Sequence, residues 1–146
     1  MSIMVTGGSG LVGKHLQDIM ENAVFLSSSD GNLLIPNDVE YLLKHYKPDV
    51  VVHLAARVGG VLDNITYPVE YLELNTLMTT NLLRACHKHD VDRVIGMGST
   101  CVYPDVVETY PMVESDLFKG PPPPEPLRIS SKPSLIRSAR NTSLYV

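Results

Sequence analysis

The chain has only two cysteines, Cys86 and Cys101, among 146 residues. Two are too few for a disulfide scaffold, so each is expected to be a free thiol in a reducing compartment. No run of eighteen or more apolar residues occurs and no stretch resembles a signal peptide, which argues against a membrane anchor or a secreted protein. Because the first predicted strand begins almost at Met1, we expect no targeting segment and a cytoplasmic location.

Positive charge is also sparse. The chain has 12 Lys and Arg against 16 Asp and Glu, a net charge of −4, and its basic residues form no cluster. Neither nucleic acid nor an anionic membrane is therefore an expected partner. Cys86, His87 and His89 crowd one helix end, but their number and spacing do not make a metal site, and no metal is expected. With 44% apolar residues the chain can bury one domain core, and a small-molecule ligand fits best.

The most informative segment is 4–13, Met-Val-Thr-Gly-Gly-Ser-Gly-Leu-Val-Gly. A short apolar run ends in three glycines at a spacing of three, which open a stretch with helical periodicity. Gly7 allows a sharp turn, Gly10 lets the backbone approach a diphosphate, and Gly13 lets the helix pack closely on the strand. A helix N-terminus there offers N–H groups and a positive dipole end to phosphates. Glycines also occur in purely structural turns, but this context favours a dinucleotide site.

Strands and helices are predicted to alternate along the chain. Apolar runs predict strands at 3–5, 23–26, 50–56 and 93–98. Helical spacing predicts helices at 11–21, 37–46 and 69–89. The run 50–56 is unbroken and rich in β-branched residues, which is typical of a parallel strand covered on both faces. The pattern predicts a doubly wound parallel sheet that binds ligands at the carboxyl ends of its strands.

The positions that recur at helical spacing are Leu11, His15, Leu16, Ile19 and Met20 in the first helix, and Val39, Leu42, Leu43 and Tyr46 on one face of the second. In the third helix the residues expected to point inward into the core are Tyr71, Leu72, Leu74, Leu77, Met78, Leu82, Leu83 and Cys86. His53, at a strand end, is expected to be packed and hydrogen-bonded rather than catalytic.

Three chemistry-bearing segments follow predicted strands: the glycine loop, Ala-Ala-Arg-Val-Gly-Gly at 55–60, and Ser-Thr-Cys at 99–101. Together with Asn-Ile-Thr-Tyr-Pro at 64–68, Gly-Ser-Thr-Cys-Val-Tyr-Pro at 98–104 and Pro-Met-Val-Glu-Ser-Asp-Leu at 111–117, they make the chain resemble the GDP-L-fucose synthases over about residues 3–126. This family is a branch of the extended short-chain dehydrogenase/reductase superfamily. The glycine loop is common to the superfamily, whereas Val-Gly-Gly and Ser-x-Cys-x-Tyr-Pro are far narrower signals.

The resemblance implies an α/β, Rossmann-type domain of an NADP-dependent epimerase-reductase that converts GDP-4-keto-6-deoxy-D-mannose into GDP-L-fucose. It implies that Ser99 donates a hydrogen bond to the C4 oxygen and that Cys101 is an acid or base at the epimerised carbons. A strand-end serine can instead cap a turn, and a lone cysteine can be a small buried hydrophobe. The implied cofactor-binding residues are Gly7, Gly8, Ser9, Gly10, Leu11, Val12, Gly13, Asn32, Leu33, Ala55 and Ala56.

The cofactor choice depends on the end of the second predicted strand. Ser27-Ser28-Ser29 offers neither the acid that favours NAD nor a cation that would hold the 2′-phosphate of NADP. The absence of an acid leaves room for a phosphate, so NADP is preferred to NAD. The other expected partners are a GDP-sugar substrate and a second copy of the chain, bound through the helix at 69–89.

The chain departs from the family near its C-terminal end. The superfamily's tyrosine and lysine, four positions apart, are not found, and neither is the later catalytic histidine. Residues 120–126, Gly-Pro-Pro-Pro-Pro-Glu-Pro, cannot be helical, and 127–146 is weakly patterned.

We therefore predict an incomplete NAD(P)-binding domain over 1–119 and a proline-rich segment with a non-homologous tail over 120–146. The tail would come from a frameshift, a splice variant or a gene-model error, and the sheet would stop before the later strands and the substrate domain. The alternatives are another NAD(P)-dependent sugar-nucleotide epimerase or dehydratase, and a non-catalytic NADP-binding module.

Overall fold

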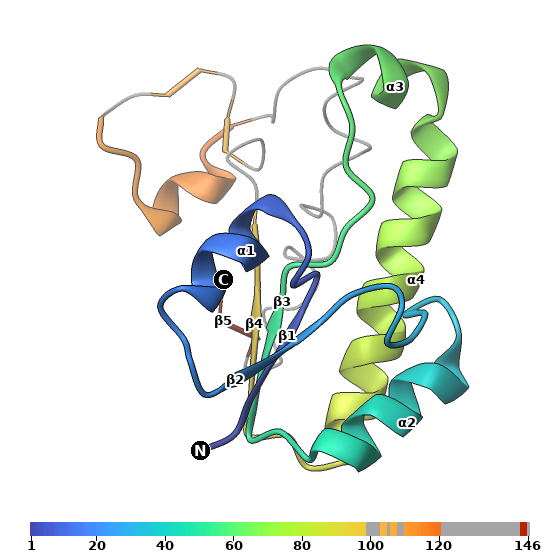
Figure 1. Ribbon diagram of the computed structural model, residues 1–146. Coiled ribbons are helices and arrows are strands. Elements are labelled where there is room, and N and C mark those ends of the chain that lie inside the picture. The colour runs from blue at the N-terminus through green and yellow to red at the C-terminus, as the bar shows by residue number, and fades with distance from the viewer. Residues whose placement is uncertain (99–102, 105, 108–109, 121–143, 146) are drawn as a thin grey trace.

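A parallel β-sheet forms the centre of the molecule (Figure 1). The computed structural model describes residues 1–98, 103–104, 106–107, 110–120 and 144–145. The sheet order is β2-β1-β3-β4-β5, and every neighbouring pair is parallel. The strands are β1 (Ile3–Thr6), β2 (Ala23–Leu26), β3 (Val50–His53), β4 (Arg93–Gly96) and β5 (Leu144–Tyr145). The predicted parallel α/β arrangement is confirmed.

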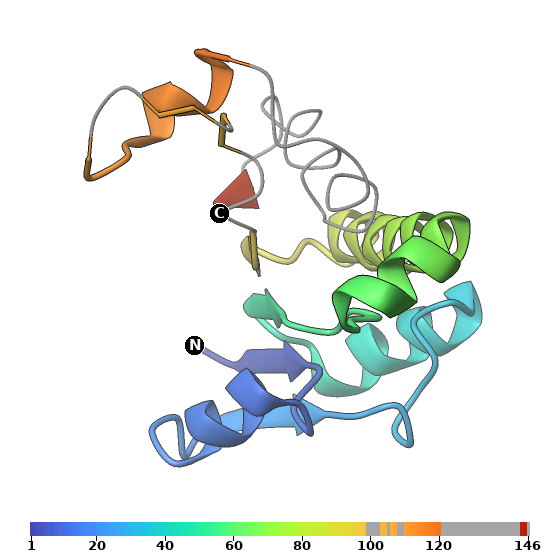
Figure 2. The same cartoon turned by 90° about the horizontal axis from the view of Figure 1, so that it is seen from above.

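Helices lie on both faces of this sheet. They are α1 (Leu11–Gln17), α2 (Pro36–Tyr46), α3 (Val61–Thr66) and α4 (Pro68–Lys88), with a 3₁₀ helix, η2, at Glu114–Phe118. Seen from above, α1 lies on one side of the strands, and α2 and α4 lie together on the other (Figure 2). The chain thus passes from one face of the sheet to the other after β2, where the strand order reverses, which is the doubly wound topology.

The main core lies between the sheet and the pair α2 and α4. Most of its buried side chains come from these strands and helices, because alternate strand residues and one stripe of each helix face each other. They are Met4, Leu26, Leu33, Val39, Leu42, Leu43, Val51, Leu82, Ala85 and Cys86. Met4 and Val51 are register partners on β1 and β3, so this face of the sheet meets the helices directly.

Helix boundaries differ from the predictions where turn geometry intervenes. The first helix ends at Gln17 instead of residue 21, since the N–H groups of Ile19 and Met20 both donate to the Leu16 carbonyl in a turn toward β2. Helix α3 was not predicted, because six residues between Gly60 and Tyr67 show too little periodicity to be recognised.

Strand ends also differ from the predictions. Strand β3 stops at His53, and residues 54–56 leave the sheet; β4 stops at Gly96 instead of residue 98. In the range 127–146, where we expected a weakly patterned tail, the two described residues form β5 beside β4.

The predicted core is only partly correct. Tyr71, Leu82 and Cys86 of α4 are buried, but Leu72 and Leu77 of the same helix are 42% and 43% exposed. In the segment predicted as the first helix, Leu11 and Ile19 are 79% and 76% exposed. Apolar residues occur on more of the surface of α4 than its neighbours cover. The periodicity of the sequence does not show which of these residues are covered.

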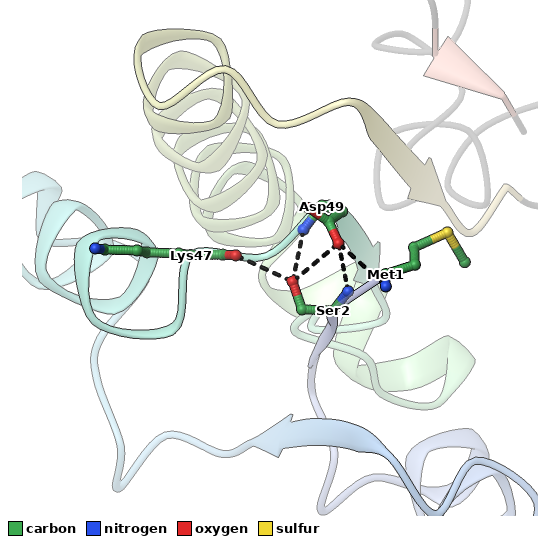
Figure 3. Close-up of polar contacts among 4 residues, drawn as sticks. All are labelled: Met1, Ser2, Lys47 and Asp49. Atoms are coloured by element: carbon green, nitrogen blue, oxygen red, sulfur yellow. Dashed lines mark hydrogen bonds and ion pairs between the residues drawn. The ribbon is translucent and has the colours of Figure 1, made fainter.

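A polar cluster joins the amino-terminal ends of β1 and β3 (Figure 3). The Asp49 carboxylate accepts from the N–H of Ser2, and the Met1 ammonium lies 3.6 Å from the same oxygen. The Ser2 hydroxyl donates to the Lys47 carbonyl at 3.0 Å and accepts from the Asp49 N–H at 3.1 Å. The hydrogen bond from the Ser2 backbone is the main reason that the pKa of Asp49 is lowered. This cluster holds the strands in register at the end opposite the loops that follow them.

Candidate functional site

A cavity of about 1000 Å³ opens at the carboxyl ends of the strands. Its wall is formed by the glycine loop after β1, the turn after β2 and the segment after β3, together with residues of α3 and α4. Met97 and Gly98, after β4, also line it. In a doubly wound sheet this edge is where ligands bind.

The glycine loop has the geometry that its spacing predicts. Gly7 has a φ of +77°, and a Cβ there would lie 2.6 Å from the Ala55 nitrogen. A Cβ at Gly13 would lie 2.5 Å from the carbonyl oxygens of both Gly7 and Gly8. Gly7 therefore makes the turn and Gly13 the close helix–strand packing, and no side chain larger than hydrogen fits at either position.

Gly10 has a different place in the loop. It is the N-cap of α1 in extended conformation, and no side chain caps the helix. Its own N–H donates to the Gly7 carbonyl at 3.0 Å. The first N–H groups of a helix have no partner within it, so the backbone of Leu11, Val12 and Gly13 brings donors to the cavity wall.

Nearly all of the predicted cofactor-binding residues line the cavity. Those in its wall are Gly7, Ser9, Gly10, Leu11, Val12, Gly13, Asn32, Leu33, Ala55 and Ala56. Gly8 does not line it: its N–H donates to the Leu26 carbonyl at 2.7 Å and ties the loop to β2. Ser99 and Cys101, the predicted catalytic residues, lie outside the described residues, so their roles stay predictions.

The turn after β2 contains an acid that the sequence analysis did not count. The Asp30 carboxylate accepts from the Ser27 N–H at 2.7 Å and from the Ser27 hydroxyl at 2.8 Å. These bonds lower the pKa of Asp30, the backbone bond most. Ser27 and Ser28 line the cavity, whereas Asp30 stands behind Ser27. The sequence signal that could have identified this acid is its position three residues after Ser27 in a turn, where an aspartate side chain can bond the backbone.

Asn32 is fixed by a second acidic side chain. Its N–H donates to the Asp38 carboxylate at 2.9 Å, and its own side-chain oxygen accepts from the Leu34 N–H at 3.0 Å. Asp38 lies in the first turn of α2, which begins at Pro36 with Ile35 as N-cap. The acid therefore stabilises the cavity wall instead of the helix end.

His53 is packed and hydrogen-bonded, as expected. It is 2% exposed; its Nδ1 lies 2.8 Å from Thr6 Oγ1, and its Nε2 lies 3.2 Å from Thr79 Oγ1. The imidazole thus connects β1, β3 and α4 beneath the cavity.

The segment after β3 is held by side chains from α3 and α4. Asn75 is 5% exposed and bonds the Arg57 backbone on both sides: the Arg57 N–H donates to Asn75 Oδ1 at 2.8 Å, and Asn75 Nδ2 donates to the Arg57 carbonyl at 3.0 Å. Asn64 Nδ2 donates to the carbonyls of Gly59 and Gly60 at 3.1 and 2.8 Å. Sequence reasoning missed both asparagines, because their partners are backbone groups brought near only by the fold.

A buried tyrosine lies behind this segment. Tyr71 is 1% exposed, and its hydroxyl donates to the Asp63 carboxylate. That bond, and burial after it, raises the pKa of Tyr71. A Cβ at Gly59 would overlap the Tyr71 hydroxyl and lie 2.6 Å from the Asp63 carboxylate. Position 59 therefore requires glycine, because the Tyr71–Asp63 pair occupies the space that a side chain would need.

His89, near Cys86, makes a structural contact. His89 Nε2 and Lys88 Nζ lie 2.8 and 2.9 Å from the Glu40 carboxylate, so the end of α4 is tied to α2. Cys86 is buried, and burial raises the pKa of its thiol to about 12. Within the described ranges no three His, Cys, Asp or Glu side chains are placed to hold a metal ion. Among the same residues no helix is long and apolar enough to cross a membrane.

A parallel, doubly wound sheet with a glycine loop at its switch between strands defines a nucleotide-binding α/β protein. The family model described as "NAD dependent epimerase/dehydratase family" matches residues 3–130. The chain belongs to this family.

Curated proteins similar to this chain include synthases of GDP-linked sugars. The GDP-L-fucose synthase of Dictyostelium discoideum is 38% identical over 130 residues, which are 84% of this chain and 40% of the relative. The GDP-L-colitose synthase of Yersinia pseudotuberculosis is 36% identical over 108 residues, 71% of this chain and 35% of the relative. The resemblance to GDP-L-fucose synthases inferred from the motifs is confirmed.

A solved structure is similar over nearly the whole chain. The GDP-L-fucose synthetase of Naegleria fowleri, determined bound to NADP, superposes with a TM-score of 0.75 at 34% identity, over 94% of this chain and 44% of that one. The chain thus spans about two fifths of the length of the relatives it matches.

Proposed function

We propose that this chain is the cofactor-binding part of an NADP-dependent epimerase-reductase of the GDP-L-fucose synthase type. The observation that carries the proposal is the cavity wall, in which Gly7, Gly10 and Gly13 bring backbone close to the space at the strand ends and Ala55 and Ala56 leave room beside it. The matched relatives and the NADP complex of a 34% identical protein support the same cofactor.

The donor set fits an anionic dinucleotide. Backbone N–H groups and hydroxyls line the wall, and no carboxylate does so among the described residues. The glycine loop would hold the diphosphate, and the turn at Ser27 to Leu33 would hold the adenosine end. Ala55 and Ala56 would border the nicotinamide end, where the bound cofactor would supply the hydride. Ser28 also lines this turn and would be the hydroxyl nearest a 2′-phosphate, because the N–H and hydroxyl of Ser27 are bonded to Asp30. The NADP complex of the 34% identical protein supports NADP over NAD.

The proposed reaction converts GDP-4-keto-6-deoxy-D-mannose into GDP-L-fucose. Enolisation and reduction both load negative charge onto the C4 oxygen, so a hydrogen-bond donor there stabilises both steps. Ser99 would be that donor, and Cys101 would move the proton at the epimerised carbons. The similarity to a GDP-L-colitose synthase favours a GDP-linked keto sugar as the substrate class.

Two features bear on the rest of the protein. Leu72 and Leu77 are half exposed on α4, and we propose that this helix mediates self-association of two copies. The cytoplasm remains the proposed location. A non-catalytic NADP-binding module is the second candidate, because the tyrosine and lysine pair is absent from the sequence.

A fluorescence titration of the purified chain with NADPH tests the cofactor proposal. Gly10→Ala is the test variant, because its Cβ would lie 3.2 Å from the Gly7 oxygen, a contact the fold can absorb, while it takes space from a diphosphate. Gly60→Ala is the matched control, since nothing lies within 4 Å of its Cβ. We expect wild type and Gly60→Ala to bind alike and Gly10→Ala to bind at least about tenfold more weakly.

The outcomes separate the candidates. A folded wild-type chain that does not bind NADPH would contradict the proposed function. Binding unaffected by Gly10→Ala would place the cofactor elsewhere. Binding without turnover of the keto sugar would favour the module over the enzyme.

A further inference from the structure

One residue supplies all of the charge in the described wall of the cavity. Arg57 lies beside Ala56, and the other lining residues are glycines, apolar side chains, or neutral hydroxyl, amide and phenol groups. A dinucleotide or a sugar nucleotide carries several negative charges. The glycine loop offers amide dipoles to one diphosphate but no full charge.

The backbone of Arg57 is fixed. Asn75, buried on α4, accepts from its N–H and donates to its carbonyl, at 2.8 and 3.0 Å. The side-chain amide of Asn75 thus bonds both the N–H and the carbonyl of Arg57, which fixes the Arg57 Cα relative to α4. Asn64 fixes the next residues through the carbonyls of Gly59 and Gly60. The side chain therefore starts from a rigid base at the cavity rim.

The Arg57 guanidinium lies over the ring of Tyr71. Its Cζ lies 5.0 Å from the centroid of the Tyr71 ring, a cation–π distance. The ring cannot turn away freely, because it is buried and its hydroxyl donates to Asp63. No ion pair of Arg57 occurs within the described part of the chain. The hydrogen bonds of Arg57 within the described residues involve its backbone N–H and carbonyl, so the guanidinium N–H groups are available to a ligand.

We propose that Arg57 binds a phosphate group of a nucleotide in this cavity. A planar guanidinium with a free edge matches the paired oxygens of a phosphate, and Arg57 is the charge that the described wall otherwise lacks. The phosphate belongs either to the dinucleotide or to the diphosphate of the sugar nucleotide, whose chemistry is shared. This inference rests on the proposed function, because it assumes that nucleotides occupy the cavity.

The test uses the full chain with Arg57→Gln and Arg57→Lys, and Arg84→Gln as the matched control. Arg84 is exposed on α4 and does not line the cavity, so its variant makes the same change in net charge elsewhere. Binding of NADPH is measured by fluorescence, and binding of GDP by its effect on thermal unfolding. We expect Arg57→Gln to weaken one probe by about tenfold to a hundredfold, Arg57→Lys by less, and Arg84→Gln by under about twofold.

The probe that weakens identifies the source of the phosphate. Loss of NADPH affinity alone assigns Arg57 to the cofactor, and loss of the GDP effect alone assigns it to the sugar nucleotide. If both probes bind wild type and Arg57→Gln within about twofold at low salt, the inference is wrong while the proposed function stands. If folded wild type binds neither probe, the proposed function fails first. Circular dichroism of each variant shows whether a loss of binding reflects unfolding.

Discussion

Leu82 and Leu77 both lie on α4 and were both expected to face the core, but the structure buries only Leu82. Leu82 is 1% exposed within the cluster between the sheet and α2, whereas Leu77 is 43% exposed. Truncating Leu82 to Ala removes contacts on all sides and leaves a cavity, at a cost of about 2–5 kcal/mol. Truncating Leu77 leaves space that water fills, so only part of the transfer free energy is lost, about 1 kcal/mol or less. Both changes have the same effect on helix propensity, so the difference isolates packing.

Urea unfolding followed by circular dichroism measures both variants. Leu82→Ala should lower the midpoint far more than Leu77→Ala, with similar slopes if the unfolded states are alike. Dilute protein is needed, since Leu77 also lies on the face proposed for self-association. Loss of the folded baseline in Leu82→Ala alone would agree with the same ranking. Equal losses in the two variants, or a larger loss for Leu77→Ala, would refute the packing of α4 described above.

Two further predictions concern titratable groups. The pKa of Asp49 is lowered in the folded chain, so its contribution to stability is present above about pH 4 and is lost as the pH falls through the folded pKa. The stability difference between wild type and Asp49→Asn should therefore shrink between pH 6 and pH 3 in thermal unfolding, and a constant difference would contradict the cluster at Ser2. The Cys86 thiol has a pKa raised to about 12, so in a Cys101→Ser background it should react with a disulfide reagent at pH 8 at least about a hundredfold more slowly in buffer than in urea. Immediate labelling of the native variant would show that Cys86 is accessible.

The parts of the fold that sequence predicted are those in which spacing determines local geometry. Gly7 and Gly13 have the close contacts that a spacing of three after a strand implies, and Val50–His53 is a buried parallel strand as its β-branched run indicated. Helix α3 was missed because it is shorter than two helical turns. Leu77 was placed in the core because periodicity reports apolar residues, and which of them are covered depends on the neighbouring elements.

The site likewise has one part that local sequence spacing predicts and one part that it does not. Its glycine-loop half is built from backbone, so the order of residues in one short segment is enough to predict it. Its Arg57 half depends on Tyr71 and Asn75 of α4, which contact Arg57 although they lie 14 and 18 positions away from it in the sequence. No periodic pattern reports such contacts, because a buried asparagine or tyrosine on a helix has the same spacing whether it packs or bonds a distant loop.

These two halves also recognise charge by different means. Amide dipoles at the glycine loop are fixed by the turn at Gly7 and cannot follow a ligand, so they favour one position of a diphosphate. The Arg57 guanidinium lies over the Tyr71 ring at the end of a flexible side chain, while the Arg57 backbone is held by Asn75. Under the proposed function, the glycine loop would therefore hold one diphosphate in a fixed position, and Arg57 would supply the full positive charge that the loop lacks.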